Sequence, residues 1–199
     1  MQLICLDLEG VLVPEIWIEV SKRTGVAALA RTTRDEPDYD KLMRYRLDLL
    51  RHHGLRLSDL QQVIATMAPL AGAARFLDAL RARYQVVILS DTFYEFAGPL
   101  MRLLGRPTLF CHRLETGADG YVAGYRLRMA DPKRAAVRAF KGLGFRVIAA
   151  GDSYNDTAML EEADAGMFFR PPASIAAQFP QFAVTQTYAE LEAAIAEAI

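Results

Sequence analysis

Residues 3–11 read Leu-Ile-Cys-Leu-Asp-Leu-Glu-Gly-Val, a short apolar run that ends in two acids, Asp7 and Glu9. A run of this length is typical of a buried β-strand. Residues i and i+2 of a strand point to the same side, so we expect both carboxylates to face one pocket. Two like charges at that distance destabilise each other unless a cation or a proton separates them.

The chain repeats this arrangement far downstream. Residues 147–150 form another apolar run, which leads into Gly151-Asp152, and Asp156 follows four residues later. If the two predicted strands are neighbours in a parallel sheet, Asp7 and Asp152 meet at its carboxyl edge, where open α/β sheets bind ligands. Carboxylate oxygens at that density suit Mg²⁺, which takes one or two carboxylates together with waters and a substrate phosphate. We therefore predict a Mg²⁺ site at this edge.

Composition narrows the class of protein. The 199 residues are 52% hydrophobic, and 23 Lys and Arg nearly balance 24 Asp and Glu. This excludes a disordered chain, and without a basic stripe we expect no nucleic-acid binding. No apolar run could span a bilayer, and the first residues lack the features of a signal peptide. Cys5 and Cys111 lie in or beside apolar runs, so we expect buried, reduced thiols in a cytoplasmic enzyme. The sequence is compatible with a homodimer.

A long segment without strand character follows the first predicted strand, residues 3–7. Three helices are predicted there, from Pro14 to Gly25, from an Asp38 cap to Gly54, and from a Ser58 cap to Pro69. We therefore expect residues 14–69 to form a helical cap domain over the carboxyl edge of the sheet. Residues 1–13 and 70–199 then form the core domain.

The core segment alternates helices and strands. Helices are predicted over residues 73–82, 94–104, 132–141, 153–162 and 188–198. Strands are predicted over residues 86–90, 108–110, 146–150, 166–169 and 183–185. Residues 112–128 resemble a β-hairpin with a turn at Asp119-Gly120. This alternation predicts an α/β fold with a doubly wound parallel sheet.

The predicted strand and helix ends carry a set of polar residues. The residues are Asp7, Glu9, Ser90, Lys133, Asp152, Asn155 and Asp156. Their order and spacing resemble the haloacid-dehalogenase-like (HAD) superfamily, and the resemblance covers essentially the whole chain. Each motif is weak by itself, but the set is specific. The resemblance implies a Rossmann-like core, a phosphoryl-transfer reaction and Mg²⁺ as cofactor.

The resemblance also implies a role for each acid. Asp7 would attack phosphorus and become an aspartyl phosphate, and Glu9 would act as general acid and then as general base. Mg²⁺ would bind Asp7, Asp152 and the backbone carbonyl of Glu9. Asp156 would orient the metal ligands or Lys133.

Other positions would bind the phosphoryl group. Ser90, with Asp91 beside it, and Asn155 would line the phosphate site, and Lys133 would offset the charge that develops there. The chain departs from the usual family pattern in three places. Glu9 stands where Asp is usual, Gly10-Val11 replaces Ser/Gly-Thr, and Asp91-Thr92 replaces the Gly-Gly of phosphoserine phosphatases.

The predicted cap is similar to the small helical cap of phosphoserine phosphatases. By this resemblance Glu15 would bind the substrate ammonium and Arg46 its carboxylate, which a guanidinium can hold by two parallel hydrogen bonds. Residues 6–17 and 90–96 look closer still to the bacterial subgroup that also transfers phosphate from phosphoserine to homoserine. The alternatives are a general phosphatase of small phosphomonoesters and a catalytically silent binding module. The three histidines have no metal-ligand spacing, so we expect His52, His53 and His112 at the surface or in loops.

Overall fold

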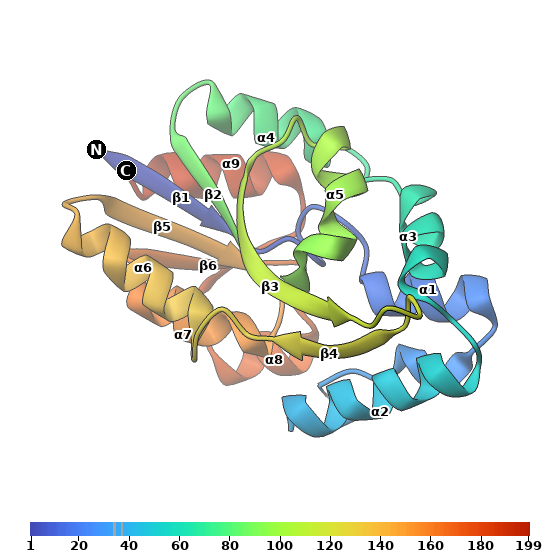
Figure 1. Cartoon of the computed structure of the whole chain (residues 1–199). Helices are drawn as coiled ribbons and strands as arrows, with labels where there is room; N and C mark the ends of the chain where they lie inside the picture. The colour runs from blue at the N-terminus through green and yellow to red at the C-terminus, as the bar shows by residue number, and fades with distance from the viewer. Residues whose placement is uncertain (34, 37) are drawn as a thin grey trace.

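The computed structural model describes residues 1–33, 35, 36 and 38–199. Its centre is a seven-stranded sheet in the order β4-β3-β2-β1-β5-β6-β7 (Figure 1). The strands are β1 (Gln2–Leu6), β2 (Gln85–Phe93), β3 (Thr108–Thr116), β4 (Val122–Arg126), β5 (Arg146–Gly151), β6 (Ala165–Phe169) and β7 (Ala183–Thr185). All neighbours pair in parallel except β3 and β4, which form the predicted hairpin. The predicted α/β fold with a doubly wound sheet is confirmed.

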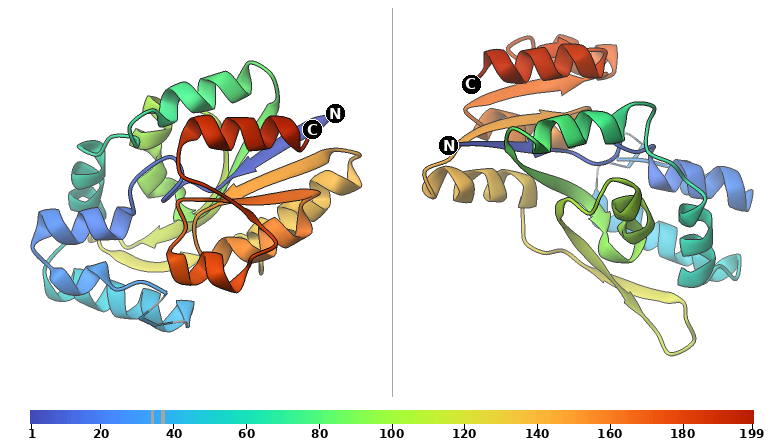
Figure 2. Two further views of the ribbon diagram at one scale, coloured as in Figure 1. Left: turned by 180° about the vertical axis from the view of Figure 1, so that it is seen from behind. Right: turned by 90° about the horizontal axis from the view of Figure 1, so that it is seen from above.

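Helices cover both faces of this sheet, as Figures 1 and 2 show. One face packs against α4 (Ala73–Arg81), α5 (Tyr94–Leu103) and α9 (Tyr188–Glu197). The other face packs against α6 (Pro132–Gly142), α7 (Thr157–Glu162) and α8 (Ala173–Gln178). The sequence did not predict α8, and the helix expected over residues 153–162 is split into the 3₁₀ turn η2 (Tyr154–Asp156) and α7.

Alternation along β1 explains why its residues 3–6 are all apolar. Ile4 and Leu6 belong to the core on the α4 side, whereas Leu3 and Cys5 belong to the core on the α6 side. A strand covered on both faces has no solvent-facing side, so all four of these buried positions are apolar. Cys5 and Cys111 are buried free thiols, as expected.

The segment between β1 and α4 is helical and lies beyond the carboxyl edge of the sheet (Figure 1). It contains α1 (Ile16–Thr24), the 3₁₀ turn η1 (Ala27–Ala30), α2 (Tyr39–His52) and α3 (Leu57–Ala65). Asp38 caps α2 by accepting the backbone N–H of Lys41. Ser58 does not cap α3, because the helix begins one residue earlier and Asp59 accepts the N–H of Arg56 instead. The boundaries of a separate cap, residues 14–69, stay a prediction.

The β3–β4 hairpin leaves the sheet and extends alongside α2 (Figure 1). Its turn contacts the start of α3, where the N–H of Leu57 donates to the carbonyl of Gly120. The segment and the hairpin therefore enclose the carboxyl edge from two sides. Across the described ranges, no helix is both long and apolar enough to cross a membrane.

Candidate active site

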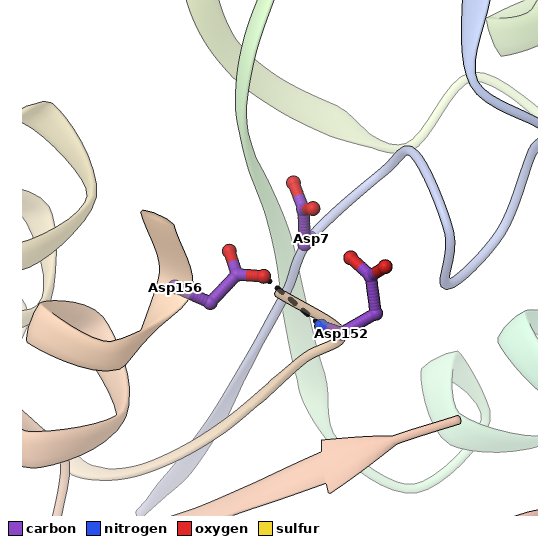
Figure 3. A group of neighbouring side chains, drawn as sticks. All are labelled: Asp7, Asp152 and Asp156. Carbon is purple, nitrogen blue, oxygen red and sulfur yellow. Dashed lines mark hydrogen bonds between the residues drawn. The ribbon is translucent and has the colours of Figure 1, made fainter. Parts of the chain in front are cut away.

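Three carboxylates gather at the carboxyl ends of β1 and β5. Leu6 pairs with Ala150 in these adjacent strands, and the Asp7 N–H donates to the Ala150 carbonyl at 2.9 Å. This register places Asp7 beside Asp152, and η2 adds Asp156. One oxygen from each of Asp7, Asp152 and Asp156 lies within 4.8 Å of the others, and all three residues are buried (Figure 3). The sequence prediction that the first two meet at this edge is confirmed.

Asp156 is already engaged by protein donors. Its Oδ2 accepts the backbone N–H groups of Asp152 and Ser153, at 3.0 and 3.1 Å (Figure 3 draws the first). Its Oδ1 accepts Lys133 Nζ at 2.7 Å. Asp7 and Asp152 are therefore the carboxylates with the most free lone pairs for a cation.

Lys133 supplies the positive charge inside this cluster. Pro132 begins α6, and Lys133 in its first turn is 4% exposed. Its Nζ lies 2.9 Å from Asp7 Oδ1 and 3.6 Å from Asp91 Oδ2, in addition to Asp156. Burial lowers the pKa of Lys133, but the three carboxylates outweigh it and hold the pKa well above its usual value.

One ammonium does not balance the acids around it. Burial raises the pKa of Asp7, and the charges of Asp156 and Asp152 raise it further against the effect of Lys133. Burial and the charge of Asp156 raise the pKa of Asp152 to about 7. A divalent cation between Asp7 and Asp152 would stabilise both as carboxylates, so the donor set fits a hard, oxygen-seeking ion.

Gly10 allows the β1–α1 loop to approach Asp152 closely. Its φ is +78°, and a Cβ there would lie 2.4 Å from Asp152 Cγ. The Gly10 N–H donates to the carbonyl of Val13, which tightens the loop. A side chain at this position would therefore displace the Asp152 carboxylate.

The substitution Gly10→Ala should lower the free energy of unfolding by more than Gly25→Ala. Gly25 has a similar φ of +74°, but a Cβ at Gly25 would meet no atom of the described residues within 4 Å. In both variants an alanine must adopt a left-handed backbone conformation, which costs about 1–2 kcal/mol. Gly10→Ala adds an overpacking cost of about 1–3 kcal/mol. Urea unfolding of the two variants measures the difference. Equal losses of unfolding free energy would mean that the Asp152 carboxylate does not need the space left by the missing Cβ of Gly10.

Glu9 lies outside the strand alternation that was expected to direct it to the same side as Asp7. The strand ends at Leu6, so the rule that residues i and i+2 face one side does not reach Glu9. Instead, Glu9 Oε2 accepts the N–H of Ile16, the first residue of α1, at 2.8 Å. Burial and the charge of Glu15 raise the pKa of Glu9 to about 8, although Ile16 and Arg46 oppose the shift. The carboxyl group thus faces the helical segment.

Arg46 extends from α2 toward the same region and is 6% exposed. Its guanidinium lies 4.6 Å from the Trp17 ring centroid, and Nη2 donates to the Arg31 carbonyl at 2.7 Å. Its buried Nε has no hydrogen-bond partner among the described residues. Glu9 and Glu15 interact with this charge, while burial lowers the pKa of Arg46 to about 10. Arg46 is therefore a cation that stacks on an aromatic ring, keeps its Nε as a free donor, and lies near the carboxyl groups of Glu9 and Glu15.

The carboxyl end of β2 contributes Ser90 and Asp91, and η2 contributes Asn155. Ser90 is buried, and its Oγ accepts the N–H of Thr92 at 3.2 Å. Asp91 Oδ2 accepts Asn155 Nδ2 at 2.9 Å, which links the β2 and β5 ends. The structure therefore brings Ser90, Asp91 and Asn155 to the same edge as Lys133.

Sequence reasoning missed three residues at this site. The buried Thr92 side chain lowers the pKa of Glu9, and Tyr39 Oη donates to the Asp91 carbonyl at 3.3 Å. His112 was expected at the surface or in a loop, and this is wrong, because it lies in β3 and is 3% exposed. His112 begins the expected hairpin segment 112–128, and in the structure this segment continues the strand predicted over residues 108–110, so His112 lies inside β3. His52 and His53 are exposed, as expected.

Comparisons with known proteins agree with this geometry. Residues 1–164 match the family of haloacid dehalogenase-like hydrolases. The chain is 61% identical over 192 residues to phosphoserine phosphatase ThrH of Pseudomonas aeruginosa, covering 96% of this chain and 94% of that relative. It is 59% identical to a phosphoserine phosphatase of Pseudomonas syringae pv. tomato, covering 96% of this chain and 81% of the relative.

A solved structure shares the fold. It is a substrate-bound phosphoserine phosphatase complex, with a TM-score of 0.77 and 20% identity over 93% of each chain. At that identity the likeness concerns the arrangement of the elements.

Proposed function

The chain belongs to the haloacid dehalogenase-like hydrolases, and from this premise we propose that it is a Mg²⁺-dependent phosphoserine phosphatase that acts through an aspartyl phosphate. The family resemblance expected from the sequence is confirmed by the match. The observation that carries the proposal is the buried cluster of Asp7, Asp152 and Lys133, with Glu9 and Arg46 on the adjoining side. The names of the two bacterial relatives support the choice of substrate.

Asp7 is the proposed nucleophile. One carboxylate oxygen attacks phosphorus, the bond from phosphorus to the serine oxygen breaks, and the phosphoryl group is held on Asp7. Water then attacks phosphorus, which releases phosphate and restores the carboxylate. Lys133 lies 2.9 Å from Asp7 Oδ1, so its ammonium is placed to offset charge on the phosphoryl oxygens. Ser90 and nearby backbone N–H groups would hold the same oxygens.

Asp7, Asp152 and, by family resemblance, the carbonyl of Glu9 would hold Mg²⁺. When bound, this ion supplies a Lewis acid that polarises the phosphoryl group. Asp156 has the supporting role, since its oxygens hold Lys133 and the backbone at Asp152.

Glu9 is the proposed general acid and base. Its Oε2 accepts the N–H of Ile16 at 2.8 Å. In the first step it would give a proton to the departing serine oxygen, and in the second it would take one from water. The extra methylene of Glu relative to Asp is accommodated by this anchoring to the start of α1.

The helical segment is proposed to select an amino-acid substrate. We assign residues 14–69 as a cap in which Glu15 pairs with the substrate ammonium and Arg46 with its carboxylate. Within the described part of the chain, Arg46 stacks on Trp17 while its Nε stays unpartnered, so the guanidinium is held in place but not saturated. Homoserine has the same two groups and one more methylene, so it would fit the clamp as an alternative acceptor to water. Incubation with phosphoserine, Mg²⁺ and homoserine, followed by identification of every phosphorylated product, tests hydrolysis and transfer together.

The substitution Arg46→Ala should reduce phosphoserine turnover far more than turnover of an aryl phosphate. Loss of a buried charged hydrogen bond to the substrate carboxylate costs about 2–5 kcal/mol, and an aryl phosphate has no such carboxylate. The measurement is kcat/KM for both substrates. Arg44→Ala is a matched control, because Arg44 is an exposed residue of α2 that pairs with Asp40. Equal losses of kcat/KM on both substrates would mean that Arg46 does not bind the substrate carboxylate, and would favour a general phosphatase.

The substitution Glu9→Gln should separate the two chemical steps. A nitrophenolate leaves well without a proton, so an aryl phosphate should still phosphorylate Asp7, whereas attack by water should lack its base. We expect a burst of about one nitrophenol per active site, followed by slow turnover, and slow phosphoserine cleavage from the outset. Stopped-flow absorbance measures the burst. Steady turnover at the parent rate would exclude Glu9 as acid and base.

A further inference from the structure

His112 is a buried polar residue that the proposed mechanism does not use. It lies in β3 opposite Phe93 of β2, and it is 3% exposed. Its Nδ1 accepts the backbone N–H of Arg128 at 3.1 Å. An imidazole nitrogen that accepts cannot carry a hydrogen, so the ring hydrogen is on Nε2. His112 therefore presents a donor at its other end.

That donor faces Asp91. His112 Nε2 lies 3.6 Å from Asp91 Oδ1, while Asp91 Oδ2 lies 3.6 Å from Lys133 Nζ and accepts Asn155 Nδ2 at 2.9 Å. Burial raises the pKa of Asp91, but Lys133, His112 and Asn155 outweigh it and hold the pKa well below its usual value. Asp91 is thus a carboxylate that faces three donors while 31% of its side chain stays exposed.

These contacts explain how an acid can lie beside the proposed phosphate site. An acid at the end of β2, directly after Ser90, would repel a dianionic phosphate if its charge faced the substrate. The contacts of Asp91 direct that charge to Lys133 on one side and to His112 on the other. We propose that His112 is a positioning residue that acts through Asp91 to keep the Lys133 ammonium at the phosphoryl group.

The proposal, which rests on the phosphatase function, also explains why Lys133 needs Asp91. When Asp7 carries the phosphoryl group, its carboxylate no longer provides a full charge 2.9 Å from Nζ. Asp156 and Asp91 then remain to hold Lys133 through the attack by water. Asn155 and His112 keep Asp91 in place for that second step.

A double-mutant cycle on an aryl phosphate tests the proposal. We expect His112→Leu and Asp91→Asn each to lower kcat by about 10–100-fold, as loss of a supporting partner does. The double variant should be no worse than the poorer single variant, because both substitutions break one chain of contacts. His112→Gln, which retains a donor, should recover part of the loss. Additive losses, or no recovery in a folded His112→Gln protein, would overturn the proposal.

A second readout does not depend on turnover. The ¹⁵N resonance of Lys133 Nζ should shift in His112→Leu relative to the parent protein. Because His112 acts on Lys133 only through Asp91, adding His112→Leu to the Asp91→Asn variant should cause no further shift. An unchanged Lys133 resonance would overturn the proposal. Aryl-phosphate turnover without phosphoserine turnover would refute the proposed substrate. The double-mutant cycle would still test the role of His112, because it is measured on the aryl phosphate. Absence of all phosphatase activity would refute the proposed function and with it the positioning role.

Discussion

The substitution Asp7→Asn should abolish turnover of every phosphomonoester while the protein stays folded. An amide is not a nucleophile toward phosphorus, so kcat should fall by more than about 10³-fold. The fold should tolerate the change, because loss of the ion pair with Lys133 is offset by relief of repulsion from Asp152 and Asp156. We expect the free energy of unfolding to change by less than about 1.5 kcal/mol. Phosphate release and urea unfolding measure the two quantities.

The control for Asp7→Asn is a purity test, because traces of parent enzyme or deamidation restore the acid. Mass spectrometry of the purified variant excludes both. More than a few per cent of parent activity in such a preparation would contradict a covalent mechanism. A large loss of stability would instead show that Asp7 is needed for the fold.

The substitution Lys133→Met should impair both activity and stability. The ammonium is 4% exposed and lies within 2.9 Å of Asp7 and Asp156, so its removal leaves buried carboxylates without a counter-charge. Removing one partner of a buried pair costs about 3–5 kcal/mol of unfolding free energy. We expect this loss in the presence of a chelator and a smaller loss in Mg²⁺, which would replace part of the missing charge. Phosphatase activity should fall by at least about 10²-fold.

Lys141→Met provides the matched comparison. Lys141 lies in the same helix, α6, but it is partly exposed and pairs with Asp164 at 3.2 Å. Its loss should change the free energy of unfolding by less than about 1 kcal/mol. If Lys133→Met were as mild as Lys141→Met in chelator, Lys133 would not be the counter-charge of the cluster.

Much of the fold follows from local pattern. Apolar runs that end in acids predicted β1 and β5, and their adjacency follows from the rules of parallel sheets. Pro132, Asp38 and Gly25 mark helix ends where the sequence placed them. These signals are local, because caps and strand periodicity act over a few residues.

Other features depend on contacts between distant segments, which a single sequence does not reveal. The Glu9 carboxyl group faces α1 because the loop turns at Gly10, where close approach to Asp152 requires glycine. The lack of metal-ligand spacing suggested a surface or loop position for His112, because its partner Asp91 is remote in sequence and local pattern does not reveal their contact. The sequence did contain one indication of such contacts, which is that Asp91-Thr92 replaces the usual Gly-Gly. Two polar side chains beside a phosphate site need hydrogen-bond or ion-pair partners elsewhere in the chain.

The central claim is that phosphoserine transfers its phosphoryl group to Asp7. The most direct measurement is rapid acid quenching of the Mg²⁺-loaded enzyme mixed with ³²P-labelled phosphoserine, followed by peptide mapping. We expect an acid-stable, hydroxylamine-sensitive label on the peptide that contains Asp7, formed no later than free phosphate and absent from Asp7→Asn. Release of phosphate from phosphoserine with no labelled enzyme at any time, or with the label on another residue, would contradict transfer to Asp7.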